Sequence, residues 1–307
     1  MTHPQFFRAG DPGLTATRID FSDAAQAELH DLARHPDMRS DLPACQETMG
    51  QVRRLLHEGP GFAVLGTLPL DATTPDVARA LYQRLAAMVA RPVAQKFTGI
   101  TLYDVHDTGR QALPGSGVRP DQTNIELHIH NDNAYNTTPP EIVALLCLRP
   151  AARQDEGWNR VVSFAAVHEA LAARFPHLLP RLYRPFPFDR QREHAPGDAP
   201  ILYAPIFARE DGRLITRMGL HQVRSGLVMT DEAVDEETHA ALAAVTHILA
   251  DPSLAVDLRL RAGEMLFVAN RAIGHSRTGF TDPPDPTRKR LMVRLWLRDS
   301  GSPAYMQ

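Results

Sequence analysis

The chain has 307 residues, of which 43% are hydrophobic, and a formal net charge of −3 at pH 7. This composition is typical of a globular protein with a sizeable core, and the lack of a dense basic cluster argues against nucleic-acid binding. The longest apolar run, residues 142–148, is far too short to cross a bilayer, so no membrane association is predicted. No basic region followed by an apolar stretch opens the sequence, so we expect no secretion signal and a cytoplasmic location.

The first 98 residues are expected to be mainly helical. Ser22 can cap a helix that runs to about residue 33, and residues 41–57 carry apolar side chains at helical spacing. A strand is predicted at 61–68. Thr74 and Pro75 then begin a helix that ends near residue 89, with the proline at its first position.

From Gly99 onward the pattern changes to short strands. They are predicted at 100–105, 125–129, 143–148, 160–164, 202–208, 213–218, 256–260, 264–269 and 288–298. Two helices are predicted among them, at 167–182 and at 230–249; Thr230 would cap the second, with Asp231 and Glu232 in its first turn. The Gly- and Pro-rich loop at 106–123 is long enough to be an active-site lid.

This pattern predicts an α+β, mainly β fold: a double-sheet jelly-roll core with flanking helices. We expect a single domain spanning residues 1–307, with the core at about 99–300 and helical insertions in it.

The segment from Leu127 to Asp132 contains several potential metal ligands close together. Within it, His130 and Asp132 are two residues apart at the end of a predicted strand. Two imidazoles and one carboxylate on one face of a metal leave three positions open for a bidentate co-substrate and dioxygen. Alone, this spacing also occurs in surface turns. His275 can supply the second imidazole, because it follows a strand and a glycine and is expected at a strand end, like His130.

The last predicted strand has two contrasting faces, since side chains alternate along a strand. One face carries only aliphatic residues and is predicted to face the core: Leu291, Val293, Leu295 and Leu297. The other carries Arg290, Met292, Arg294, Trp296 and Arg298. A buried guanidinium requires an anion, which a dicarboxylic acid could supply. Alternatively, an internal Asp or Glu pairs with the arginines, or the strand is an edge with this face in solvent.

Three blocks together resemble the taurine dioxygenase and clavaminate synthase superfamily of Fe(II)- and 2-oxoglutarate-dependent oxygenases. They are residues 128–149, residues 270–278 and the Arg-Leu-Met-Val-Arg run at 290–294, in the order found in that superfamily. The similarity covers about residues 99–300. It implies a double-stranded β-helix core and Fe(II) bound by His130, Asp132 and His275, while His128 is not a ligand.

The resemblance also implies roles for residues that bind the co-substrate. Arg290 matches the arginine that binds the distal carboxylate of 2-oxoglutarate, and Arg294 is expected near the other carboxylate. Asn159 stands where the superfamily usually has a threonine, a departure that retains a hydrogen-bond donor. Because the carboxylate ligand Asp132 is present, hydroxylation or desaturation is favoured over halogenation.

The predicted reaction is hydroxylation of an unactivated C–H bond in a small acid or amino-acid-like substrate, consuming dioxygen and releasing succinate and carbon dioxide. Candidate substrate contacts are Arg217, Asp189, Arg192 and Glu193, although a solvated surface is the alternative for all four. Two other functions stay open: a zinc-dependent hydrolase or isomerase with the same three ligands, and a non-catalytic jelly-roll protein that binds a small acid. The sequence does not determine the oligomeric state.

Overall fold

Two mainly antiparallel β-sheets form the centre of the protein in the computed structural model. The structure describes residues 5–35, 41–111, 119–231 and 234–305. The larger sheet has the order β1-β2-β13-β6-β15-β3, and β4 also pairs with β15. Only the β1–β2 pair is parallel within this sheet. Its strands are β1 (Arg18–Ile19), β2 (Phe62–Leu65), β3 (Arg91–Val93), β4 (Tyr103–Val105), β6 (Ile142–Arg149), β13 (Met265–Ala269) and β15 (Leu291–Arg298).

The smaller sheet has the order β12-β7-β14-β5. Its strands are β5 (Leu127–His130), β7 (Asn159–Ser163), β12 (Ala255–Leu258) and β14 (Ile273–Arg277). Side chains of the two sheets share one hydrophobic cluster, in which Val161 and Ile273 of the smaller sheet pack with Met292 and Trp296 of β15. The two sheets therefore face each other across a common interior.

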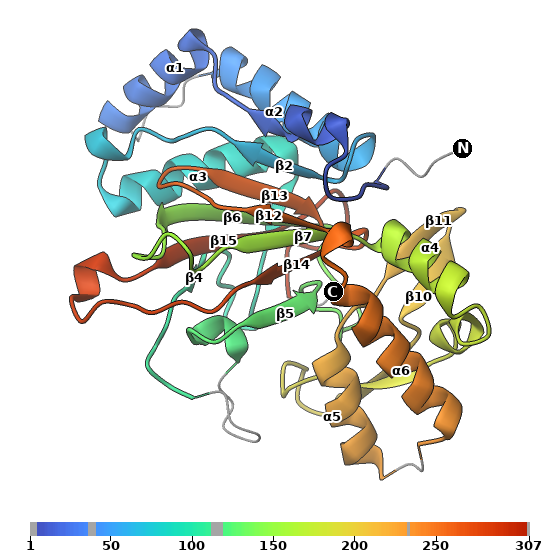
Figure 1. Ribbon diagram of the computed structural model, residues 1–307. Helices are drawn as coiled ribbons and strands as arrows, with labels where there is room; N and C mark the ends of the chain where they lie inside the picture. Colours follow the sequence, from blue (N-terminus) through green and yellow to red (C-terminus); the bar gives the residue numbers. More distant parts are fainter. Residues whose placement is uncertain (1–4, 36–40, 112–118, 232–233, 306–307) are drawn as a thin grey trace.

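Three N-terminal helices cover the outer face of the larger sheet (Figure 1). They are α1 (Asp23–Arg34), α2 (Pro43–His57) and α3 (Pro75–Val89). The predicted caps are confirmed, because Ser22 accepts a hydrogen bond from the Ala25 amide and Thr74 accepts one from Val77. The aliphatic face of β15 packs against these helices, so the core face predicted from the alternation is confirmed.

A second group of helices packs at the other side of the molecule, with α5 and α6 farthest from α1 and α2 (Figure 1). It comprises α4 (Phe164–Arg174), α5 (Leu220–Thr230) and α6 (Glu236–Leu249), with two hairpins. The hairpins are β8 (Phe186–Asp189) with β9 (Ile201–Ala204), and β10 (Phe207–Glu210) with β11 (Arg213–Thr216). Short 3-10 helices lie at Pro12–Thr17, Leu70–Ala72, Pro120–Gln122, Leu179–Tyr183, Pro252–Leu254 and Pro286–Arg288. Among the described residues, no helix combines the length and apolar character needed to cross a membrane.

The start predicted for the helix at 230–249 is wrong. Thr230 ends α5, and Asp231 adopts a left-handed conformation with φ of 51°, which stops the helix. The following helix begins only at Glu236, because the Asp235 side chain accepts a hydrogen bond from the Thr238 amide and so caps it. Glu232, expected in the first turn, lies outside the described residues.

Two further boundaries differ for local reasons. The predicted strand at 202–208 is divided into β9 and β10 around Pro205, whose nitrogen cannot donate a ladder hydrogen bond. The predicted helix at 167–182 instead starts at Phe164, capped by Ser163, and ends before Pro176.

Candidate metal centre

His130, Asp132 and His275 come together where the two sheets meet; Asp132 and His275 are buried, and His130 is partly exposed. His130 is the last residue of β5 and pairs in register with His275 on β14, with ring centroids 4.5 Å apart. The Nε2 atom of each imidazole lies 3.4 Å from Oδ1 of Asp132. One ligand atom from each residue lies within 4.8 Å of the others, which confirms that the three side chains converge. The expectation that His275 ends a strand is wrong: it occupies the centre of β14.

Two asparagines hold the turn that carries Asp132. Asn270 accepts a hydrogen bond from the Asp132 amide at 2.8 Å and donates to the Asp132 and Pro140 carbonyls. Asn131 donates to the Thr216 and Asn270 carbonyls and accepts from the Met218 amide. Because both amides are buried with these bonds made, the backbone of Asp132 is fixed on both sides.

The second oxygen of Asp132 has partners of its own. Trp296 donates its indole N–H to Oδ2 at 2.6 Å, and Nη1 of Arg294 lies 3.1 Å from the same atom. Burial by itself raises the pKa of the Asp132 carboxyl, but Arg294 and the contacts with both histidines hold the pKa well below its usual range. Asp132 is therefore a carboxylate whose Oδ1 faces the histidines.

The donor set suits a divalent metal with nitrogen and oxygen ligands. Nδ1 of His130 lies 2.8 Å from the carbonyl of His128, which fixes the ring and leaves Nε2 to accept a metal. His128 itself points outward, with 89% of its side chain exposed. Two imidazole nitrogens and one carboxylate oxygen fit a non-haem Fe(II) centre with open positions.

Arg290 and Asn159 also lie in this interior. Arg290 is 3% exposed, and its Nη1 atom is buried without a hydrogen-bond partner. Burial lowers the pKa of its guanidinium to about 10. Asn159 is buried at the start of β7, in register with Arg277 on β14. Among the described residues, no hydrogen bond or ion pair joins Arg290 or Asn159 to the triad, and the side chain of Arg290 pairs with no acid.

Arg294, in contrast, is paired within the protein. Besides Asp132, it lies 3.5 Å from Asp121 and donates through Nε to Gln95 at 2.8 Å. Asp121 also lies 3.4 Å from Arg119, which pairs in turn with Glu193. Paired charges of alternating sign thus connect Asp132 of the triad, through Arg294, Asp121 and Arg119, to Glu193.

Arg119 and Asp121 belong to the loop at 106–123 that was predicted as a lid, so one flank of that loop contributes to this chain of charges. The structure describes this loop at 106–111 and 119–123, and the remainder lies outside the described residues. Glu193 is reached as well by the hydroxyls of Tyr135 and Tyr305, at 2.7 and 3.1 Å. Of the four candidate substrate contacts, Glu193 is therefore the one linked to the triad.

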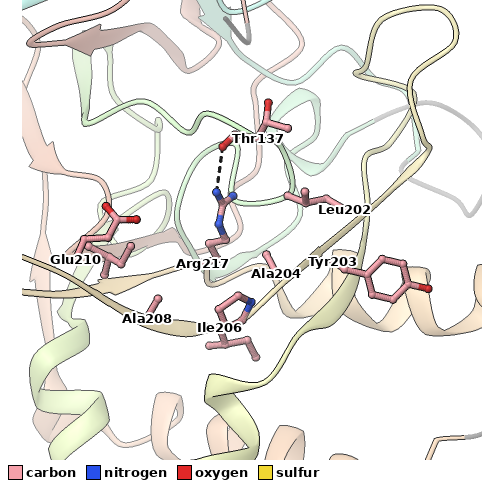
Figure 2. Close-up of a pocket in the computed structure, with 10 residues that line it drawn as sticks. Thr137, Leu202, Tyr203, Ala204, Ile206, Ala208, Glu210 and Arg217 are labelled. Carbon is pink, nitrogen blue, oxygen red and sulfur yellow. Dashed lines mark hydrogen bonds between the residues drawn. The ribbon is translucent and has the colours of Figure 1, made fainter.

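The other three candidates lie elsewhere. Asp189 accepts hydrogen bonds from the Gln191 amide and the Ser225 hydroxyl, and Arg192 is exposed. Arg217 donates to the carbonyls of Ala134, Asn136 and Thr137, the last of which is drawn in Figure 2.

Arg217 lines a cavity of about 340 Å³ that none of the triad residues lines. Aliphatic side chains line part of it, among them Leu202, Ile206 and Ile215. Glu210 lies on the opposite side of Arg217 from Leu202 and Tyr203 (Figure 2). Because the guanidinium of Arg217 is engaged by the segment that follows Asp132, we assign it to holding that segment.

Several residues around the triad were not predicted. Trp296 and Asn270 contact Asp132 from 164 and 138 residues away, and Gln95 reaches Arg294 across 199 residues. The alternation of β15 did place Trp296 on the inner face with Arg294. Asn270 begins the block at 270–278 but has no predicted role, and Gln95 shows no sequence signal that distinguishes it from a surface amide.

A profile of the family described as "Taurine catabolism dioxygenase TauD, TfdA family" matches residues 20–296. The chain belongs to the TauD/TfdA family. The match contains the whole triad together with Arg290 and Arg294, so the geometry above is that of a member of this dioxygenase family.

Two curated relatives are similar over part of the chain. A uridine-5'-phosphate dioxygenase from a Streptomyces species is 33% identical over 154 residues, 49% of this chain and 53% of the relative. An L-asparagine oxygenase from Streptomyces coelicolor is 29% identical over 178 residues, 56% of this chain and 48% of the relative. The matches thus span about half the length of each of these relatives.

Solved structures show the same fold over nearly the whole chain. An asparagine oxygenase in complex with Fe(II), 2S,3S-3-hydroxyasparagine and succinate has a TM-score of 0.67 at 22% identity, covering 92% of this chain and 94% of that one. The non-haem iron oxygenase OrfP, in complex with Fe and alpha-ketoglutaric acid, has a TM-score of 0.65 at 14% identity, with the same coverage.

Proposed function

We propose that this protein is an Fe(II)- and 2-oxoglutarate-dependent oxygenase that hydroxylates an amino-acid-like substrate or another small acid. One observation carries the proposal: three ligand atoms lie within 4.8 Å of one another in the same part of the protein as Arg290, a buried guanidinium with no carboxylate partner among the described residues. A metal explains the convergence of the three ligands, and a dicarboxylic 2-oxo acid explains the unpaired cation.

His130, Asp132 and His275 would hold the iron. Iron bound there supplies the activation of dioxygen, coupled to conversion of 2-oxoglutarate to succinate and carbon dioxide. Trp296 and Arg294 orient the Asp132 carboxylate, while the His128 carbonyl sets the tautomer of His130. Because Asp132 occupies the third ligand position, hydroxylation or desaturation is favoured over halogenation.

Arg290 would hold the distal carboxylate of 2-oxoglutarate, with Asn159 as a donor nearby. Arg294 is less suited to the other carboxylate than the sequence suggested, because Asp132 and Asp121 already balance its charge. We place Arg294 instead between the iron site and the substrate.

Both signs of charge next to the triad favour a zwitterionic substrate. The cations Arg294 and Arg119 are paired here with the anions Asp121 and Glu193, and the carboxylate and ammonium groups of an α-amino acid could exchange with these partners of opposite sign. The L-asparagine oxygenase relative and the hydroxyasparagine complex support this class. Since the other curated relative acts on uridine-5'-phosphate, a nucleotide is the second candidate; its phosphate would need a surplus of cations, which this group of four lacks.

We also propose that the two facing sheets form a double-stranded β-helix, or jelly-roll, core within one domain of residues 1–307. Two observations support this. The sheets share a hydrophobic interior, from which Trp296 donates a hydrogen bond to Asp132 of the triad, and β2 of the N-terminal part is hydrogen-bonded to β13 of the core.

The decisive experiment measures succinate formed from 2-oxoglutarate by the purified protein with Fe(II) and ascorbate. The twenty common amino acids, uridine-5'-phosphate and a no-substrate control form the panel. Substrate-dependent succinate, with a hydroxylated product in the mass spectrum, supports the proposal. Substrate turnover with Zn(II) but no succinate would establish the hydrolase alternative, and binding without turnover under either metal would establish the non-catalytic one.

A further inference from the structure

Two arginines lie buried against the same aromatic ring. The guanidinium carbon of Arg277 lies 4.8 Å from the ring centroid of Phe280, and that of Arg290 lies 5.2 Å from it. The two arginine residues are only 4% and 3% exposed. Nε and Nη1 of Arg277 and Nη1 of Arg290 are buried without hydrogen-bond partners. Three donor atoms in one region are therefore unsatisfied.

This region lies one step along the sheet from the iron ligands. Arg277 follows His275 by two residues on β14, so both side chains point to the same face about 7 Å apart. Asn159 on β7 is directly opposite Arg277. A Cβ atom added to Gly157 would lie 3.4 Å from Nε of Arg290, so the start of β7 also passes beside the second arginine.

The protein itself provides too little negative charge here. No carboxylate of the described residues lies within 4.0 Å of the side chain of Arg277 or Arg290. Asp282 accepts from the Arg290 amide through Oδ1, while its Oδ2 is unpaired, and Asp107 and Asp121 act on Arg277 only from farther away.

Both guanidinium groups are buried against Phe280, so two positive charges lie close together away from solvent. A guanidinium keeps its proton in proteins. The free-energy cost of burying its charge is therefore offset by a nearby anion and not by loss of the proton. Cation–π contact with Phe280 offsets only part of the desolvation. The two arginines together therefore make a site for an anionic group.

We propose that Arg277 and Arg290 form a two-armed clamp on the distal carboxylate of the 2-oxo acid, and that Arg277 makes the site selective for a dicarboxylic co-substrate. The clamp rests on the proposed function, and it adds Arg277 to the residues that bind the co-substrate. Nη2 of Arg277 already donates to the carbonyls of Thr123 and Ile125, which orients the side chain. Its Nε and Nη1 remain to bind the carboxylate.

The test compares two ligands that differ only at the distal end: 2-oxoglutarate, and 2-oxovalerate, in which a methyl group replaces the carboxylate. Each is titrated into the anaerobic Fe(II) protein, and the visible metal-to-ligand band gives its dissociation constant. Arg277→Gln is expected to weaken 2-oxoglutarate about 10- to 150-fold, the loss of one charge-assisted pair, and to leave 2-oxovalerate within about twofold. Unchanged affinity for 2-oxoglutarate, or equal weakening of both ligands, would overturn the clamp.

A metal-free measurement separates this inference from the proposed function. Glutarate should raise the melting temperature of the wild-type protein without iron more than valerate does, and Arg277→Gln should remove that difference. Arg277→Lys, which retains a donor for the two carbonyls, replaces the glutamine variant if that one does not fold. If the protein forms no succinate but keeps the glutarate effect, the function fails and the clamp stands. If it forms succinate and Arg277→Gln or Arg277→Lys binds 2-oxoglutarate as tightly as wild type, the clamp fails alone.

Discussion

The indole N–H of Trp296 lies 2.6 Å from Oδ2 of Asp132, on the side of the carboxylate away from the two histidines. This bond joins the strand β15 of the larger sheet to the turn that follows β5 of the smaller one. The orientation of the carboxylate thus depends on how the two sheets pack.

We predict that Trp296→Phe keeps the packing of the shared core but removes this hydrogen bond. Partners of this kind, which orient a metal ligand, typically contribute 10- to 100-fold to metal affinity. We therefore expect Fe(II) affinity to fall about 10-fold or more, measured anaerobically by competition with a chelator. Trp158→Phe is the matched control, because the Trp158 indole donates to the Gln154 carbonyl, away from the triad. Equal affinities for the two variants would show that the bond does not support metal binding.

The two neighbouring histidines of β5 should behave in opposite ways. His130→Ala removes a ligand and is expected to abolish stoichiometric binding of Fe(II) and turnover. His128→Ala should leave metal affinity within about twofold, because the side chain is 89% exposed and only its backbone carbonyl contacts His130. Loss of metal binding in His128→Ala would mean that the triad is wrongly assigned.

The sequence predicted those features that depend on a fixed local period. Alternation along 290–298 correctly predicted an aliphatic core face opposite the arginines, because side chains alternate in any strand. The structure shows that the arginine face is buried as well, which the sequence had left open. The strand β14 was not predicted, since its sequence Ile-Gly-His-Ser-Arg holds one large apolar residue and lacks the usual signal. It is a strand nonetheless because it pairs with β5 on one side and with β7 on the other.

Contacts between distant segments could not be predicted in the same way. Whether Arg294 would meet an external carboxylate or an internal one depended on Asp121, whose loop has no periodic pattern. Asn270 likewise became informative only when the fold placed its amide against the Asp132 backbone.

Asn270 provides a prediction about stability. Asn270→Ala would leave the Asp132 amide and the Asp132 and Pro140 carbonyls without their present partner in a buried site. We expect the free energy of unfolding to fall by about 3 kcal/mol, or roughly 6–12 °C in melting temperature, together with weaker metal binding. Calorimetry of the metal-free protein measures the first effect. Asn124→Ala, whose side chain makes no hydrogen bond within the described residues, should change the melting temperature by less than about 2 °C. A similar melting temperature for both variants would contradict the role of Asn270.

The last prediction concerns Arg290, which is fully enclosed and has no acid beside its guanidinium within the described residues. If it binds the distal carboxylate, Arg290→Ala removes a charge-assisted pair of about 1.5–3 kcal/mol, or about 10- to 150-fold in 2-oxoglutarate affinity. Arg290→Lys should recover only part, because an ammonium group cannot form two parallel hydrogen bonds. Iron affinity should stay nearly constant in both variants, since Arg290 does not contact the triad. Anaerobic titration of 2-oxoglutarate into the Fe(II) protein, followed through the visible band, measures the change. An unchanged dissociation constant in Arg290→Ala would transfer the role to Arg277 or Arg294, and the Arg277→Gln titration then identifies which of the two holds the carboxylate.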